Sequence, residues 1–138
     1  MQTNYFNRVQ IEIKKTYYLY DRYKFSSTFA LLYHNKPIDV AELGKYIRMS
    51  DHIVNLDDNH YFINFAFTNQ QNAFKASQNL LFNLDKHFQE TTSRIAIDTF
   101  DIAKTPQMVI NRLVQILEAL KKHQYERIED ENILNEMI

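Results

Sequence analysis

The sequence contains no cysteine, and this absence excludes several kinds of site at once. Disulfides, thiolate zinc centres and cysteine nucleophiles are all ruled out, and the composition fits a reducing compartment. The first ten residues, MQTNYFNRVQ, lack the apolar core of a signal peptide. No apolar run approaches the ~18 residues that span a bilayer. We therefore expect a cytoplasmic protein without membrane insertion.

Glycine is almost absent as well, since Gly44 is the only one. Loops that cradle phosphate with backbone N–H groups usually need glycine for close approach and positive φ. Neither GxGxxG nor GxxxxGK[ST] occurs in the chain. The sequence therefore lacks the usual glycine-built phosphate loops.

Length and composition are those of one globular domain. The chain has 138 residues, of which 45% are hydrophobic and 24% charged, so it can bury a core without disulfides or metals. Its formal net charge of −1 gives no basic field for nucleic acid, and we expect no nucleic-acid partner. We expect a single domain, 1–138, made of an N-terminal helix (1–24), a core (25–124) and a tail (125–138).

Apolar periodicity and turn residues divide the chain into helices and strands. The pattern predicts helices over 4–22, 39–47, 70–89 and from Thr105-Pro106 onward, and strands over 25–34, 52–56, 61–68 and 93–99. Asp39 and Thr105 are predicted helix caps, and Pro106 suits a first helical position. Two interpretations of the acidic tail remain: a final strand followed by a short partner-seeking helix, or a frayed end.

The same periodicity predicts which side chains are buried. The strand over 61–68 alternates like a half-buried hairpin strand. The three helices after the first are expected to bury Val40, Leu43 and Ile47, then Phe74, Leu81, Leu84 and Phe88, then Val109, Leu113, Ile116 and Leu120.

The order of these elements is α-β-α-β-β-α-β-α. Without the first helix it reads βαββαβ, which is the ferredoxin-like arrangement. The fold class is therefore α+β: a ferredoxin-like, nucleotide-cyclase-like core with an added N-terminal helix and a C-terminal helix and tail.

Several short motifs stand in an order that resembles the GGDEF domain of diguanylate cyclases. The family's T-x-x-x-N-R pattern matches residues 3–8, and its basic-aromatic step before the first strand matches Arg22-Tyr23-Lys24. The family's R-x-x-D matches Arg48 to Asp51, and five residues later the GGDEF hairpin matches Asp57-Asp58-Asn59-His60-Tyr61. The last family helix matches residues 113–128. The resemblance implies a bacterial cyclic di-GMP signalling domain.

The departures from the family are chemical. Active members end the first strand in aspartates that hold magnesium, whereas this chain has Tyr33-His34-Asn35. A phenol, an imidazole and an amide supply no charge to balance that ion. The segment that reads the guanine is reduced to Lys36-Pro37-Ile38. In the hairpin, Asp57 and Asp58 replace two glycines and would repel a triphosphate, while Asn59 and His60 replace the acidic pair. We therefore expect no enzyme activity, no catalytic residue and no cofactor.

Two other interpretations of the hairpin turn remain. Asp57, Asp58 and His60 are residue types that bind transition metals. Asp and Asn are also common in solvated turns, and no second cluster of ligands can be placed beside this one. We expect no metal site, and a metal-dependent nucleotidyl enzyme of the cyclase type is the alternative.

The R-x-x-D pair suggests a ligand that needs no catalysis. In the family this motif is the inhibitory site for cyclic di-GMP. An arginine fork can donate to guanine O6 and N7, and a carboxylate can accept from the N–H edge. The simpler interpretation of Arg48 and Asp51 is an ion pair or loop cap. A second arginine would also be needed, and the candidates are Arg8, Arg22, Arg94 and Arg112.

A tyrosine cluster completes the set of candidate features. Tyr17, Tyr18, Tyr20 and Tyr23 suit either a core or an exposed aromatic contact surface. Together these features predict a degenerate GGDEF-like regulatory domain that works with a protein partner or as a homodimer, with cyclic di-GMP as a candidate ligand at Arg48 and Asp51. A pure interaction domain with no small ligand is a further alternative.

Overall fold

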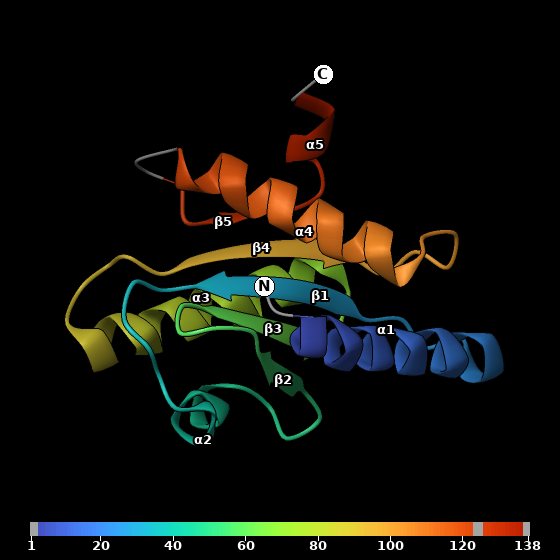
Figure 1. Ribbon diagram of the computed structural model, residues 1–138, viewed down its shortest axis with the longest axis horizontal. Helices are drawn as coiled ribbons and strands as arrows, with labels where there is room; N and C mark the ends of the chain where they lie inside the picture. The colour runs from blue at the N-terminus through green and yellow to red at the C-terminus, as the bar shows by residue number, and fades with distance from the viewer. Residues whose placement is uncertain (1–2, 123–125, 137–138) are drawn as a thin grey trace.

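The computed structural model describes residues 3–122 and 126–136, with side chains from residue 6 to 135 within those ranges. Its elements follow the predicted order, with short additions (Figure 1). They are α1 (Thr3–Tyr23), β1 (Thr28–Tyr33), α2 (Val40–Leu43), the 3-10 turn η1 (Gly44–Tyr46), β2 (His52–Asn55), β3 (His60–Phe65), α3 (Gln70–Phe88), β4 (Arg94–Thr99), α4 (Pro106–Lys121), β5 (Ile128–Glu129) and α5 (Ile133–Glu136).

The sheet has the strand order β2-β3-β1-β4-β5. The first four strands are antiparallel neighbours, and β5 pairs with β4 in parallel. This is the order of a ferredoxin-like βαββαβ unit with one strand added. Helices α2 and α3 pack on one face of the sheet, and α1 and α4 pack on the other (Figure 1). The predicted α+β fold class is confirmed.

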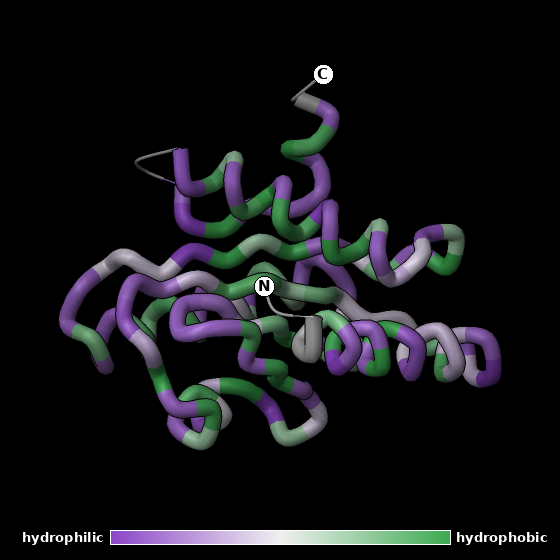
Figure 2. Tube along the Cα trace, viewed as in Figure 1, coloured by the Kyte–Doolittle hydropathy of each residue, from purple (hydrophilic) through white to green (hydrophobic). Residues whose placement is uncertain are grey.

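The central strands are covered on both faces. In β1, Phe29 and Leu31 contact the layer of α1 and α4, while Ala30 and Leu32 contact the layer of α2 and α3. Figure 2 shows the hydrophobic residues concentrated along these strands. The prediction that β3 is half-buried was wrong, because α1 covers its second face and buries Asn64, whose Nδ2 donates to Thr16 Oγ1 over 3.1 Å.

The predicted caps are present, but not every predicted core residue is buried. Asp39 accepts from the N–H of Ala41, and Thr105 accepts from the N–H of Met108. All four predicted positions of α4 are buried. Val40 is 38% exposed, because α2 ends after one turn and reaches the core through Leu43.

The buried face of α3 also differs from the prediction. Leu81 and Leu84 are buried as expected, but the face is completed by smaller residues, Ala73 and Ser77. Phe74 is 37% exposed because it lies at the edge of this face.

The tail is part of the fold where it is described. Ile128 pairs with Ile95, and both Ile128 and Ile133 are buried. Glu131 accepts from the backbone N–H of Thr99 over 2.7 Å and from its hydroxyl over 2.8 Å. The expected tail residues Met137 and Ile138 lie outside the described residues. Among the helices of the described ranges, none combines the length and apolarity needed to cross a bilayer.

Candidate functional site

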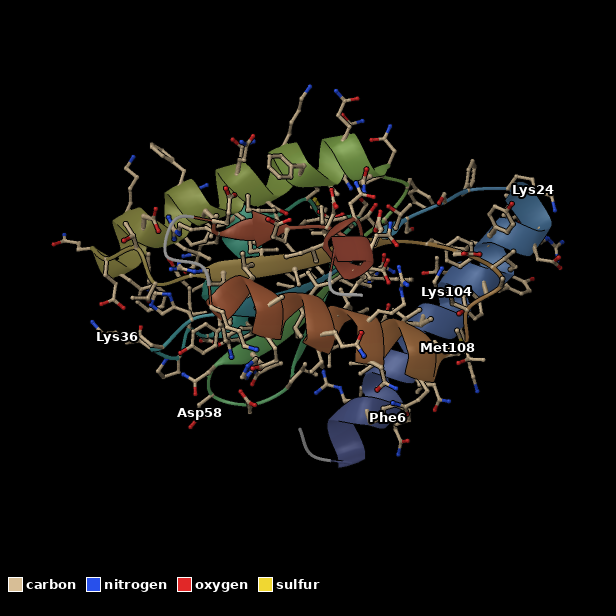
Figure 3. All side chains as sticks on the ribbon, turned by 90° about the horizontal axis from the view of Figure 1, so that it is seen from above. Phe6, Lys24, Lys36, Asp58, Lys104 and Met108 are labelled. Atoms are coloured by element: carbon tan, nitrogen blue, oxygen red, sulfur yellow. The ribbon has the colours of Figure 1, made fainter. Side chains whose placement is uncertain are left out.

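The two motifs singled out by the sequence lie at opposite ends of the central strands. Antiparallel pairing sets Tyr33 beside His60 at one end and Thr28 beside Phe65 at the other. The Asp57–His60 turn therefore lies at the end of β1, and Arg48 reaches the opposite end through Ala66. Figure 3 shows the labelled Asp58 of this turn at the same end of the molecule as Lys36, which follows β1, and far from Lys24 at the other end.

The Asp57–His60 turn is closed by its own hydrogen bonds. The carboxylate of Asp57 accepts from the N–H of Asn59 over 2.8 Å and lies 2.8 Å from His60 Nδ1. Asn59 Nδ2 donates to the carbonyl of His34 over 2.9 Å, and the N–H of His34 donates back to the carbonyl of Asn59 over 3.0 Å. Asp58 is exposed. The turn is therefore fastened to the end of β1.

The negative charge of Asp57 is stabilised by hydrogen-bonding groups within the turn. Burial raises the pKa of this carboxyl, but the Asn59 N–H and the His60 ring outweigh burial, and the net pKa is lowered. Of the predicted ligands, the turn brings Asp57 and His60 together. Within residues 3–122 and 126–136, no three or more His, Cys, Asp or Glu side chains are grouped in a way that could hold a metal ion.

The end of β1 holds a buried histidine rather than carboxylates. The ring of His34 is 1% exposed and stacks on Phe88 with centroids 3.7 Å apart. Its Nδ1 lies 2.6 Å from Ser93 Oγ, and its Nε2 lies 2.9 Å from Glu90 Oε1. Burial lowers the pKa of His34 and outweighs the opposite effect of Glu90. Sequence reasoning missed this cluster, because His34 lies more than 50 residues before its partners Phe88, Glu90 and Ser93 along the chain.

The segment after β1 runs to α2 without a helix between Tyr33 and Val40. Tyr61 fixes this connection. Its hydroxyl accepts from the N–H of Ile38 and donates to the carbonyl of Ile38, both over 2.9 Å. Burial raises the pKa of the Tyr61 hydroxyl. In this chain Tyr61 is therefore a core residue that holds the link between β1 and α2.

Arg48 and Asp51 contact each other, and their exposures differ sharply. The Asp51 side chain is 1% exposed and the Arg48 side chain 53%. Asp51 accepts from Arg48 Nη2 over 2.7 Å, from Arg48 Nε over 3.2 Å and from the N–H of Ala66 over 3.2 Å. Arg48 Nη2 also donates to the carbonyl of Ala66 over 2.8 Å and to Thr68 Oγ1. The hydrogen bond to Asp51 raises the pKa of Arg48. Of this pair, only the guanidinium of Arg48 is accessible from solvent.

The candidate second arginines differ in how they are bound. Arg112 makes two hydrogen bonds to the buried Asp98, over 2.8 and 3.1 Å, and Arg94 donates to the carbonyls of Thr91 and Ser93. Arg8 and Arg22 are exposed.

The tyrosine cluster divides between the two interpretations. Tyr17 and Tyr20 pack on Phe100, with ring centroids 5.2 and 5.1 Å apart. Tyr18 and Tyr23 are exposed. The first pair is partly buried against the core, and the second pair lies at the surface.

Comparison with known proteins identifies the fold. No protein-family model and no curated protein matches the sequence. The diguanylate cyclase SiaD of Pseudomonas aeruginosa, solved with its activator SiaC, aligns with a TM-score of 0.73 and 11% identity over 90% of this chain. This chain spans 57% of the SiaD chain. The GGDEF domain of DgcB from Caulobacter crescentus, solved with c-di-GMP, aligns with a TM-score of 0.71 and 11% identity over 88% of this chain and 86% of its own. The protein therefore has the fold of the GGDEF domains of diguanylate cyclases.

Proposed function

We propose that this domain is a non-catalytic regulatory module of the bacterial cytoplasm that acts by binding another protein, with cyclic di-GMP as a candidate second ligand. The observation that carries the proposal is the closed Asp57–His60 turn. Asp57 is bound to Asn59 and His60, and Asn59 is bound to His34. A turn that uses its polar groups internally offers few of them to a triphosphate.

The end of β1 supports the same proposal. The resemblance to the family places magnesium-binding aspartates there, whereas this chain has the buried His34 held by Ser93 and Glu90. Such a ring supplies no negative charge to a divalent cation. The link from Tyr33 to Val40, where the family reads guanine, is short and fastened to Tyr61.

The solved relatives suggest two modes of regulation. SiaD was solved with a protein activator and DgcB with c-di-GMP. Protein binding is the better supported mode here, because the buried Asp51 carboxylate is used inside the fold. A nucleotide would meet the exposed side of Arg48.

A turnover assay tests the absence of catalysis. The purified protein is incubated with GTP and either magnesium or manganese, and cyclic di-GMP and pyrophosphate are measured beside an active diguanylate cyclase. We expect product only from the active enzyme. Turnover that is lost in Asp58→Ala would establish the alternative, a metal-dependent nucleotidyl enzyme, and would overturn the proposal.

Calorimetry tests whether the protein binds cyclic di-GMP. Cyclic di-GMP is titrated into the wild type, Arg48→Ala and Lys75→Ala, an exposed lysine on α3 that serves as the matched control. Heat in the wild type and Lys75→Ala but not in Arg48→Ala would establish a receptor. No heat of binding in any of the three proteins would favour a module that binds protein alone.

A further inference from the structure

A row of exposed aromatic rings runs from the last turns of α1 to the turn that follows β3. Tyr18, Tyr23, Phe25 and Phe67 are 59%, 52%, 50% and 55% exposed, and with Arg22 we call them the aromatic strip. Arg22 Nη1 donates to the Tyr18 hydroxyl over 3.0 Å, and its guanidinium lies 5.7 Å from the centre of the Tyr23 ring. Tyr23 stacks on Phe25 at 5.8 Å, and Phe25 meets the edge of Phe67 at 5.2 Å. The strip is therefore continuous.

The backbone is strained at two places in this row. Lys24 has a φ of 60° and Phe67 a φ of 56°, both in the left-handed region that bulky residues rarely adopt. The turn at Lys24, whose N–H donates to the carbonyl of Tyr20 over 2.7 Å, leads from Tyr23 to Phe25. Phe67 is held by Ser27 Oγ on its N–H. The strained backbone at Phe67 is not offset by burial of its ring, which stays in solvent. Backbone strain of this kind is concentrated at functional sites.

The charge around the strip is positive. Among the ion pairs of the described residues, neither Arg22 nor Lys24 has a carboxylate partner. Asp21, Arg22 and Lys24 together carry a net charge of +1. Arg48, whose guanidinium donates to Ala66 and Thr68 on either side of Phe67, borders the far end, but its charge is paired with the Asp51 carboxylate and adds no net charge to the strip.

These charges indicate which kind of partner the aromatic strip can bind. Two copies of the strip placed face to face would oppose like charges, which disfavours a symmetric dimer through this surface. A nucleic acid needs a stronger basic field than a chain of net charge −1 provides. A protein segment with carboxylates among apolar side chains complements both the cations and the rings. Aromatic residues and arginine are also the residues that dominate binding energy in protein interfaces.

We propose that the aromatic strip is the docking surface for a partner protein segment rich in acidic and apolar residues. The proposal rests on the proposed function, for which it supplies the surface and the chemistry of the partner.

Peptide selection tests the strip directly. A phage library of short random peptides is panned on the wild type alone, and the double variant Phe25→Ser/Phe67→Asn is kept for the binding measurements. We expect the enriched peptides to carry an excess of Asp and Glu beside apolar residues. By fluorescence anisotropy, each should bind the double variant and Arg22→Glu about tenfold or more weakly than the wild type. Phe82→Ser, which removes another ring 61% exposed on α3, should bind as the wild type does.

Thermal unfolding separates binding from stability. Asparagine tolerates the left-handed backbone better than phenylalanine, so the melting temperature of Phe67→Asn should stay within roughly 3 °C of the wild type or rise. A larger fall would assign Phe67 to stability and overturn its role in docking.

Three other outcomes would overturn the strip: peptides without an acidic excess, equal binding to the double variant, or equal loss in Phe82→Ser. Each can occur in a protein that makes no cyclic di-GMP. Turnover of GTP would instead overturn the proposed function, whatever the peptides bind.

Discussion

The carboxylate of Asp51 is buried beneath the guanidinium of Arg48, with Arg48 Nη2 and Asp51 Oδ1 2.7 Å apart. The side chain of Asp51 is 1% exposed and that of Arg48 is 53% exposed. The carboxylate also accepts from the backbone N–H groups of Arg48 and Ala66, over 3.1 and 3.2 Å. Asp51 therefore organises the loop before β2 and the end of β3, while Arg48 covers it and still faces solvent.

This asymmetry predicts unequal costs of truncation. Asp51→Ala leaves the buried N–H of Ala66, the part-buried N–H of Arg48 and the Arg48 guanidinium without this acceptor, and should lower the free energy of unfolding by about 3 kcal/mol. Arg48→Ala leaves the carboxylate with both backbone donors, and should cost about 1–2 kcal/mol. Urea unfolding of the two variants measures the difference. A cost for Arg48→Ala equal to or above that of Asp51→Ala would contradict the expectation.

The hairpin turn offers a matched pair of aspartates. Asp57→Ala removes the acceptor of Asn59 N–H and the partner of His60, and should cost about 1–2 kcal/mol of unfolding free energy at neutral pH. Asp58→Ala, at the exposed neighbouring position, should stay within about 0.5 kcal/mol of the wild type.

The same pair has a predictable pH dependence. The folded pKa of Asp57 is lowered, so its contribution is complete above the ordinary value of 3.8 and is lost as pH falls through the folded pKa. The difference between the two variants should therefore shrink in acid. A difference that persists below the folded pKa would show that Asp57 acts through packing rather than charge.

His34 gives the unfolding free energy a second pH dependence, which arises because burial disfavours the charged form of its ring. Burial lowers the pKa of this imidazole from its ordinary value of 6.5. Below 6.5 the unfolded chain binds a proton that the folded protein resists, so unfolding free energy falls as pH falls, and the fall stops once pH passes below the folded pKa.

Paired histidine variants isolate this effect. His34→Gln should remove the His34 part of the pH slope, whereas His52→Gln, at an exposed position, should keep it. Unfolding free energies between about pH 5 and 8, the range in which histidine titrates, measure the slope. An unchanged slope in His34→Gln would show that other groups carry it.

The sequence determined the elements of this protein and their order. The caps at Asp39 and Thr105 and the stripe of α4 were predictable because each depends on residues a few positions apart. The position of the R-x-x-D motif before the hairpin was predictable for the same reason.

Only the tertiary structure decided how those residues are used. It buried both faces of β3, exposed Val40 and Phe74, and enclosed Asp51 beneath Arg48. It also brought His34 to Glu90, 56 residues away, and Phe25 to Phe67. Local periodicity distinguishes polar from apolar positions, but burial, pairing and pKa depend on which distant elements close over them. In this chain that closure also fastened the Asp57–His60 turn to the end of β1, where Asn59 Nδ2 donates to the carbonyl of His34.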